Sequence, residues 1–310
     1  MRLNLHLLRV FFEVAERRSF SRAAEALHIS QPAVSKAVRE LERLVDLPLI
    51  ERGPRGTKGA RLTDSGIALA EHARGIFALE RAALDDVRAR RSRQRGRLTL
   101  GASTTIAGYW LPMPLAALAK RHPDADLRVV VSNTDAIAAA LIDCAVDLAL
   151  VEGVVDDPRI VSTVWRDDPL RIVVPSDVAP ARGRAPATAA LDAATWLVRE
   201  PGSGTRMAAE TMLRSLGIAP ARTVELGSNE AIARAVAAGL GVAILPECVV
   251  RDLLRLGEVA CLRHAGAERA RPLFLLQLRE RPMSPLATAF VEALVQPGKP
   301  RSPPRRGARH

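Results

Sequence analysis

The chain has 310 residues, of which 48% are hydrophobic and only 3% aromatic, and its formal net charge at pH 7 is +11. This length exceeds one ordinary domain and predicts two or three. No stretch approaches the roughly 18–20 consecutive apolar residues of a membrane span. The polar start of the chain, with Arg2 and His6, is not a signal peptide. We therefore expect a cytoplasmic protein with no membrane partner.

The basic charge is concentrated at the two ends of the chain. Residues 1–95 contain 19 basic and 12 acidic side chains, residues 96–295 contain 21 and 22, and residues 296–310 contain five and none. This distribution predicts a polyanionic partner for the N-terminal region. The Pro/Arg-rich residues 296–310 lack large apolar side chains, and we expect them to be disordered.

The first 27 residues predict two helices. Residues 3–17 carry apolar side chains on one face, as an amphipathic helix does. Ser19 and Ser21 are capping residues just ahead of residues 22–27, which are strong helix formers. A tight turn then leads into a third, longer helix.

This third helix is predicted to have one buried and one polar face. Its cap is Ser30 or Gln31, with Pro32 in the first turn, where a missing N–H costs nothing. Apolar residues spaced by four, three and four form the buried stripe, namely Val34, Val38, Leu41 and Val45. The small and hydrogen-bonding side chains of the other face suit contacts with double-stranded DNA in the major groove: Ser30, Gln31, Pro32, Ala33, Ser35, Lys36 and Arg39. The alternative is an ordinary helical hairpin.

Residues 52–61 contain three glycines and a proline and cannot be helical. The residues on either side, 49–51 and 61–63, could pair as short strands and make the segment a wing. Its basic side chains are candidates for phosphate or minor-groove contact, namely Arg52, Arg55, Lys58 and Arg61. A solvated turn is the alternative.

A long helix follows, capped at Thr63 and Asp64 and reaching to about Arg93. A heptad-like seam runs along it, through Ala70, Ala73, Phe77, Glu80, Leu84 and Val87. We expect dimerisation through this seam, and packing against the chain's own residues is the alternative.

From Leu98 onward, short apolar strands alternate with helical stretches, which predicts parallel sheets covered by helices. The expected strands are residues 98–101, 127–131, 146–151, 170–175, 196–199, 223–226, 242–245 and 271–278. The expected helices are residues 109–121, 136–144, 205–216, 231–238, 247–254 and 285–295. Two such sets predict two lobes with a cleft, the last strand and helix returning to the first lobe.

Two hydroxyl-rich stretches follow predicted strands and open predicted helices. The first contains Ser103, Thr104 and Thr105, and the second contains Ser203, Gly204 and Thr205. Each alone is an ordinary helix cap, but facing each other across a cleft they could hold an anion at two positive helix ends. Glu152 is expected to point into the same crevice, where its charge complicates a pure anion site.

Residues 9–52, with the run SQPAVS at 30–35 and the ending LIER at 49–52, resemble the winged helix-turn-helix of LysR-type bacterial regulators. The stretches 101–109 (GASTTIAGY), 151–153 (VEG), 199–206 and 227–232 (GSNEAI) are similar to one branch of that family. That branch includes regulators of sulfite reduction, cysteine biosynthesis and carbon-fixation operons.

The resemblance implies an α/β protein with four parts. They are a winged helix-turn-helix (1–62), a linker helix (63–95), a two-lobed effector domain shaped like a periplasmic binding protein (96–295), and the tail (296–310). Lobe I would span about 96–168 and 272–295, and lobe II about 169–271. The implied function is sequence-specific transcription regulation, controlled by a small anionic effector such as a sulfur oxyanion or a phosphorylated metabolite. A homodimer or homotetramer and contact with RNA polymerase are implied as well.

Rival functions have little support in the sequence. An enzyme or a solute-binding protein could use the two-lobed domain, and an architectural DNA protein could lack an effector. The six histidines and three cysteines are scattered without metal or acid/base spacing, so we expect no catalysis, metal or cofactor. The odd cysteine count favours buried thiols over a redox sensor.

Overall fold

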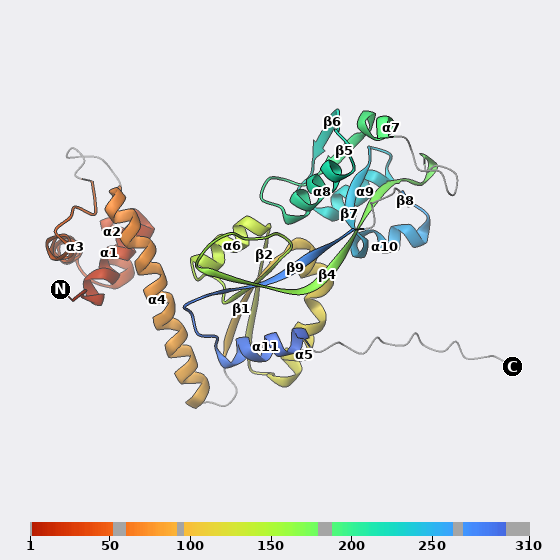
Figure 1. Cartoon of the computed structure of the whole chain (residues 1–310). Helices are drawn as coiled ribbons and strands as arrows, with labels where there is room; N and C mark the ends of the chain where they lie inside the picture. Colours follow the sequence, from red (N-terminus) through yellow and green to blue (C-terminus); the bar gives the residue numbers. More distant parts are fainter. Residues whose placement is uncertain (1, 52–59, 92–95, 179–187, 263–268, 296–310) are drawn as a thin grey trace. The chain divides into compact units, whose positions relative to one another are not determined.

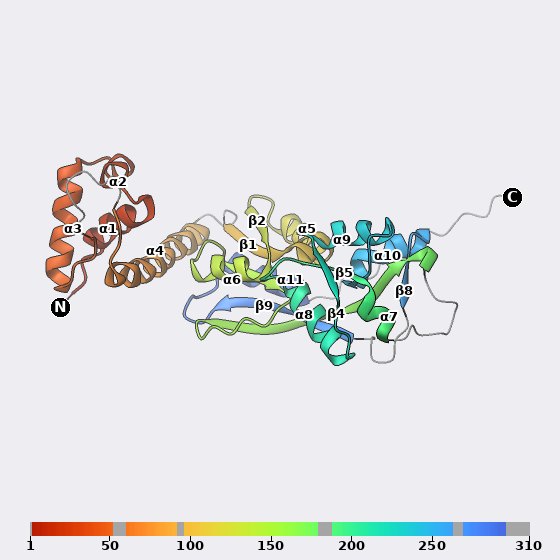
Figure 2. The same cartoon turned by 90° about the horizontal axis from the view of Figure 1, so that it is seen from above.

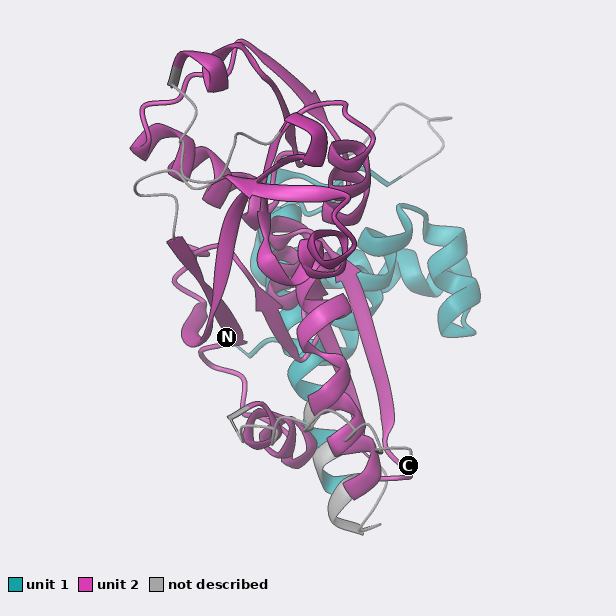
Figure 3. Ribbon diagram, turned by 90° about the vertical axis from the view of Figure 1, so that its right-hand side faces the viewer, with its two compact units in different colours: residues 1–87 teal, residues 88–310 magenta. Residues whose placement is uncertain are grey.

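The computed structural model describes residues 2–51, 60–91, 96–178, 188–262 and 269–295. The chain divides into two compact units, residues 1–87 and 88–310 (Figure 3). Each unit is described by itself below.

The N-terminal unit is a bundle of helices with a β-bridge. It contains α1 (Leu5–Arg17), α2 (Phe20–Leu27), α3 (Gln31–Val45) and most of α4 (Asp64–Arg91) (Figure 1). The first helix begins two residues later than predicted, because the Asn4 side chain accepts hydrogen bonds from the His6 and Leu7 N–H groups. Of the predicted capping candidates, Ser19 rather than Ser21 caps α2, and Ser30 rather than Gln31 caps α3.

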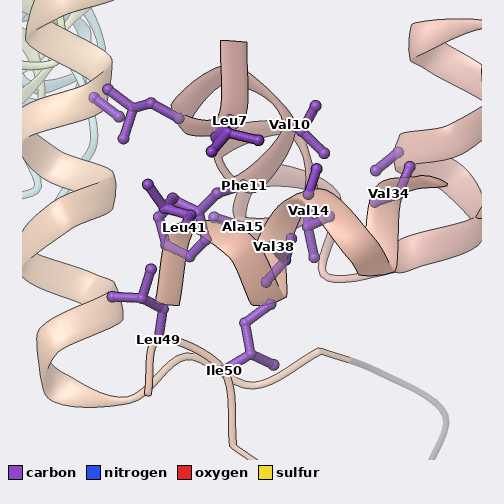
Figure 4. Packing of buried hydrophobic residues seen from close by; sticks show 14 of the residues in the cluster. Leu7, Val10, Phe11, Val14, Ala15, Val34, Val38, Leu41, Leu49 and Ile50 are labelled. Atoms are coloured by element: carbon purple, nitrogen blue, oxygen red, sulfur yellow. The ribbon is translucent and has the colours of Figure 1, made fainter. Parts of the chain in front are cut away.

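One apolar cluster holds this unit together. Figure 4 shows the side chains of α1 and α3 gathered above Leu49 and Ile50, which follow α3. The predicted stripe of α3 is buried at Val34, Val38 and Leu41, which are at most 2% exposed, whereas Val45 is only partly buried. The predicted strand pair exists as a single antiparallel bridge between Ile50 and Leu62.

The seam predicted on α4 is wrong as a dimer seam over its first half. Ala70, Ala73 and Phe77 are buried in the apolar cluster of the chain's own N-terminal unit. The alternative of packing against its own residues therefore holds for these three positions. Further along, Leu84 and Val87 are 49% and 63% exposed.

The C-terminal unit is built on a mixed sheet rather than on the parallel sheets that the sequence predicted. Its strands lie in the order β2-β1-β3-β9-β4-β7, with β8 also paired to β4. A separate parallel pair, β5 and β6, is joined to β7 by a bridge between Trp196 and Val242. The bounds of the strands are β1 (Arg97–Ser103), β2 (Asp126–Ser132), β3 (Leu148–Val151), β4 (Ile160–Pro175), β5 (Thr195–Val198), β6 (Arg222–Glu225), β7 (Ala243–Pro246), β8 (Val259–Leu262) and β9 (Arg269–Leu278).

The sheet is mixed rather than parallel because the long strands β4 and β9 run antiparallel. They pair over ten positions, from Ile160 opposite Leu278 to Leu170 opposite Arg269, and run side by side along this unit (Figure 2). The first ten residues of β4 were not predicted, because half of them are polar and most are at least partly exposed. The helix α7 and the strand β8 were not predicted either.

The helices cover this framework in two lobes joined by β4 and β9 (Figure 1). Lobe I comprises β1–β3 with the π-helical turn η1 (Ile106–Trp110) and the helices α5 (Pro112–Arg121), α6 (Thr134–Ile142) and α11 (Pro285–Val295). Lobe II comprises β5–β8 with the helices α7 (Thr188–Ala193), α8 (Gly204–Ser215), α9 (Asn229–Ala237) and α10 (Glu247–Leu256); the short turn η2 (Ser176–Val178) follows β4.

Each lobe has its own apolar core. Leu98 and Leu100 of β1 pack with Phe290 of α11, so this last described helix returns to lobe I as expected. Trp196 of β5 packs with Met212 of α8 in lobe II. Buried polar residues lie where the two lobes meet, among them Thr105 of lobe I and Asn229 of lobe II. No helix of the described residues is long and apolar enough to cross a bilayer.

Candidate functional sites

The exposed face of α3 is organised by local hydrogen bonds. The Gln31 side-chain amide donates to Ser35 Oγ at 2.9 Å, and Arg39 Nε donates to the Ser35 carbonyl oxygen at 3.3 Å. Ser30, as N-cap, accepts from the Ala33 N–H at 3.4 Å. The six predicted residues Ser30, Gln31, Pro32, Ala33, Lys36 and Arg39 are exposed and Ser35 is half-buried. This polar face therefore lies opposite the buried stripe, as the periodicity predicts.

Only the base of the predicted wing can be described. Beside the Ile50–Leu62 bridge, the Glu51 N–H donates to the Arg61 carbonyl oxygen at 2.8 Å. The Arg61 side chain is 85% exposed, 3.5 Å from the Glu51 carboxylate. Arg52, Arg55 and Lys58 lie outside the described residues.

In the C-terminal unit, Thr105 and Thr205 approach each other across the two lobes. Asn229, the first residue of α9 in lobe II, is fully buried. Its Nδ2 donates to Thr105 Oγ1 at 2.7 Å and to Thr205 Oγ1 at 3.2 Å. Both threonines are at most 3% exposed. The two hydroxyl-rich stretches therefore meet through one buried amide, which the sequence analysis did not single out.

Ser103 and Ser203 have a local role in the structure. Ser103 Oγ accepts from the Ile106 N–H at 3.3 Å, and Ser203 Oγ accepts from the Arg206 N–H at 3.4 Å as the N-cap of α8. These are helix-capping bonds. Both serines are buried near the lobe junction.

Glu152 and Gly204 belong to the same junction. A Cβ atom on Gly204 would lie 2.8 Å from the Gly153 N atom, 3.0 Å from Glu152 Cβ and 2.7 Å from Thr134 Oγ1. Glycine therefore permits this approach between α8 and lobe I. Thr134 Oγ1 and Asn229 Oδ1 are buried and have no hydrogen-bond partner among the described residues. Such groups cost free energy unless a ligand or water completes them.

Arg271 of β9 joins two buried carboxylates to Thr205. Its Nε and Nη2 donate to Asp168 Oδ2 at 3.0 and 2.8 Å, and its Nη1 donates to Thr205 Oγ1 at 2.8 Å. Glu152 Oε1 lies 3.6 Å from Arg271 Nη2. Burial raises the pKa of Asp168, although Arg271 opposes this shift.

The cysteine nearest this site is unsuited to thiolate chemistry. Cys248 Sγ lies 3.8 Å from Asp168 Oδ1. Burial, together with the negative charge of Asp168, raises the pKa of the Cys248 thiol to about 12. The thiol is therefore protonated at neutral pH. No group of three or more histidine, cysteine or acidic side chains that could hold a metal ion occurs within the described ranges.

Thr104 is bonded to a second buried guanidinium. Arg199, the residue after β5, is 3% exposed, and its Nη1 donates to Thr104 Oγ1 at 3.2 Å. Its Nε and Nη2 each donate to Glu200 at 2.8 Å. Burial raises the pKa of Glu200, but the hydrogen bond and charge of Arg199, together with hydrogen bonds from its own backbone and from Asn133, outweigh burial and hold this pKa below its usual value.

All seven residues predicted for the effector site thus lie at or beside the lobe junction. The junction residues that prediction missed are polar groups on other elements, namely Thr134, Asp168, Asn229 and Arg271. Their signal in the sequence was weak: Asn229 follows a capping serine, and Arg271 opens an apolar run. Arg199 and Asn229 both lie in stretches that resemble the family branch, 199–206 and 227–232, but no role was predicted for either residue.

These features define a regulator that pairs a helix-turn-helix with a two-lobed ligand-binding domain. The model of the bacterial regulatory helix-turn-helix protein, lysR family, matches residues 5–67, and the model of the LysR substrate binding domain matches residues 91–297. The chain belongs to the LysR family. It is a DNA-binding transcription regulator with an effector-binding domain and not an enzyme.

Known relatives include regulators of the predicted branch. The chain is 37% identical to the transcriptional regulator CfxR of Cupriavidus necator, over 91% of this chain and 88% of CfxR. It is 31% identical to CysL of Bacillus subtilis, over 83% of this chain and 85% of CysL.

Solved structures share the fold. Full-length CbnR in complex with its target DNA has a TM-score of 0.64 and 24% identity, covering 94% of this chain and 99% of CbnR. The CcmR regulatory domain of Synechocystis PCC6803 in complex with 2-PG has a TM-score of 0.59 and 25% identity, covering 65% of this chain and 96% of that domain.

Proposed function

We propose that this regulator responds to a small anion bound where lobes I and II meet. The observation that carries the proposal is the buried bridge Thr105–Asn229–Thr205, with the buried Thr134 hydroxyl, which can donate to an anion, left without a partner among the described residues. Ser103, Thr104, Thr105, Ser203 and Thr205 supply hydroxyls, and Arg199 supplies a positive charge. A sulfur oxyanion or a phosphorylated metabolite fits these donors.

The charges of the junction limit which anions suit it. Two guanidiniums, Arg199 and Arg271, face three carboxylates: Glu152, Asp168 and Glu200. An additional anion is therefore disfavoured unless a carboxylate is neutralised or moves away. We infer that the effector either donates a hydrogen bond to Glu152 or displaces one of these carboxylates.

Relatives support both ligand classes. The CcmR regulatory domain has been solved in complex with 2-PG, and relatives include RuBisCO operon regulators. The branch resemblance also includes sulfur-metabolism regulators. A thermal-shift screen of the full chain against sulfite, sulfate, thiosulfate, phosphate, 2-PG and sugar phosphates tests the proposal. An effector must raise the melting temperature and change the affinity for operator DNA, because only a ligand that favours one arrangement of the protein can regulate it.

Thr105→Val tests the site itself. The substitution keeps the shape of the side chain and removes the hydroxyl that accepts from Asn229. If that hydroxyl binds the effector, its loss costs on the order of 1.5–3 kcal/mol, about ten- to a hundredfold in affinity. Effector-free DNA binding should stay near that of the parent. Calorimetry with the effector found in the screen decides, and unchanged affinity would remove Thr105 from the site.

On the DNA side, we propose that Gln31, Pro32, Ser35 and Lys36 contact bases and Arg39 the backbone, with Ser30 and Ala33 at the same helix end. The wing residues Arg52, Arg55 and Lys58 are proposed to contact phosphates or the minor groove. The support is the exposure of the polar face of α3 and the basic charge of this region.

We further propose a homodimer or homotetramer that acts in the cytoplasm, where its DNA lies, and contacts RNA polymerase. A two-fold dimer would require an inverted-repeat operator. The exposed apolar residues of α4 are the candidates for the contact, namely Ile67, Leu79, Leu84 and Val87.

A further inference from the structure

The two buried guanidiniums of the junction have carboxylate partners of different accessibility. Asp168, the partner of Arg271, is fully buried on β4. Glu200, the partner of Arg199, is 26% exposed, although the Arg199 side chain itself is only 3% exposed. Glu200 can therefore swing into water, where a carboxylate is well solvated, whereas Asp168 cannot.

Glu200 occupies the part of Arg199 that best recognises an oxyanion. Its two oxygens accept separately, Oε2 from Nε and Oε1 from Nη2, each at 2.8 Å. A guanidinium binds carboxylate, sulfate or phosphate in this same two-bond geometry. The remaining nitrogen, Nη1, already contacts Thr104 of lobe I.

Glu200 also takes part in contacts between the lobes. Asn133, the N-cap of α6 in lobe I, directs its Nδ2 to Glu200 Oε1 at 3.5 Å and to the Pro201 carbonyl oxygen at 3.4 Å. The Arg199–Glu200 pair thus contacts lobe I through both of its members, with Thr104 on one side and Asn133 on the other. An oxyanion in place of the carboxylate would meet the same partners.

We propose that Glu200 is a built-in substitute for the effector, a carboxylate that occupies Arg199 until an oxyanion displaces it. This inference rests on the proposed function and assigns Arg199 as the main charge partner of the effector. Displacement moves the negative charge of Glu200 out of the junction as the effector enters, so the charge of the junction changes only by the excess of the effector's negative charge over that of one carboxylate.

The substitute sets the affinity of the site. Because Glu200 is next to Arg199 in the chain, it competes at a constant, high local concentration. The measured affinity equals the intrinsic affinity multiplied by the fraction of molecules whose Arg199 is free, so it falls as Glu200 occupies Arg199 more often. Weak oxyanions present throughout the cell would then be excluded, while an effector that makes further bonds to the hydroxyls of the junction can compete.

The test compares Glu200→Gln with the full-length parent, using sulfate as the probe. Glutamine keeps the size of the side chain and removes its charge, so Arg199 should become available to any small oxyanion. We expect the apparent sulfate Kd, measured by calorimetry at constant ionic strength, to fall on the order of tenfold. An unchanged or weaker sulfate affinity would overturn the proposal, because it would mean that Glu200 does not compete.

Three further variants make the result specific. Glu247→Gln is the charge control: it removes a carboxylate of similar exposure, 37%, from a surface pair with Arg171 in lobe II. It should leave the sulfate affinity at the parental value. A gain in sulfate affinity equal to that of Glu200→Gln would mean a general charge effect. Arg199→Lys in the Glu200→Gln background should abolish the gain, since lysine lacks the two-bond geometry. If Glu200→Gln does not fold, Glu200→Asp should give a gain in the same direction, because the shorter side chain fits Arg199 less well.

This experiment separates the inference from the proposed function. If Glu200→Gln binds sulfate more tightly but no anion changes the DNA affinity of parent or variant, the substitute role stands and the proposed regulation fails. If Thr105→Val loses the effector response while Glu200→Gln gains nothing, the effector site stands and the substitute role is wrong.

Discussion

The polar face of α3 and the lobe junction present their proposed binding residues in opposite ways. On α3 these side chains are mostly exposed, and their bonds are local, such as Gln31 to Ser35 four positions on. At the junction they are buried, and the Asn229–Thr105 bond joins residues 124 positions apart. A DNA-reading surface must be free before DNA arrives, whereas a junction between lobes can be occupied by its own side chains until a ligand replaces them. The comparison indicates that hydrogen bonds between sequence neighbours suffice to arrange an exposed binding surface. A buried site between two lobes needs hydrogen bonds between residues far apart in the sequence.

The largest expected effect concerns what holds the N-terminal unit together. Phe77 is 2% exposed, packs against Phe12 with the two rings tilted by 50°, and lies under the Arg9 guanidinium, whose carbon is 4.0 Å from the ring centre. Phe77→Asp should destabilise this unit by at least about 3–5 kcal/mol, the cost of losing a buried phenylalanine alone. Hydrogen exchange of α1 and α3 measures the loss.

The dimer contact needs a different variant, because Phe77→Asp would unfold the unit rather than only separate subunits. Leu84→Asp places its charge on an exposed position of the same helix. Light scattering should show a smaller mass for Leu84→Asp with native hydrogen exchange in α1. An unchanged mass would exclude this part of α4 from the subunit contact.

The next largest expected effect concerns the stability of the C-terminal unit. The variant tests whether this stability depends on the buried charges of the junction, as that of the N-terminal unit depends on its apolar cluster. Arg271→Ala leaves Asp168 buried without its partner and should cost about 3–5 kcal/mol. All three tryptophans lie in the C-terminal unit, so their fluorescence follows its unfolding. As control, Arg234→Ala breaks an exposed pair with Glu258 and should cost less than about 1 kcal/mol. Equal losses of stability for the two variants would mean that the buried Arg271 contributes no more to stability than the exposed Arg234.

For the exposed polar face of α3, the expected losses of DNA-binding free energy are smaller and depend on the DNA sequence. Gln31→Ala or Ser35→Ala should cost about 1–3 kcal/mol on the operator and much less on random DNA. Arg61→Ala should instead weaken binding to any DNA and reduce the salt slope by about one unit. Titrations on both DNAs at several salt concentrations separate these outcomes, and equal losses on both from Gln31→Ala would exclude base reading by that residue.

The smallest expected effect concerns the reactivity of the Cys248 thiol at the junction. Because burial and Asp168 raise the pKa of Cys248 to about 12, less than one thiol in about a thousand is ionised at pH 8. Iodoacetamide should therefore leave Cys248 unlabelled in the native chain and label it after denaturation. Mass spectrometry of the peptide reports the result, and rapid native labelling would reopen a redox role at the junction.

Much of the N-terminal unit could be predicted because its information is local. Capping serines and the spacing of Val34, Val38 and Leu41 each act within a few residues. The main error was the α4 seam, since an apolar stripe has the same spacing whether it meets another subunit or its own core. Only the packing of Phe77 into the apolar cluster of the N-terminal unit distinguished a subunit contact from packing within the chain.

In the C-terminal unit, the sequence by itself determined most helices and strands and the two hydroxyl-rich stretches, because periodicity and capping are local. The tertiary structure alone decided that β4 and β9 pair antiparallel over ten positions, since a half-polar strand has no distinctive periodicity. It also decided the partners of each buried charge. Arg271 meets Asp168 from 103 positions away, and Arg199 meets Thr104 from 95. A buried charge must find an opposite charge or a hydrogen bond, but which one it finds depends on how the strands cross.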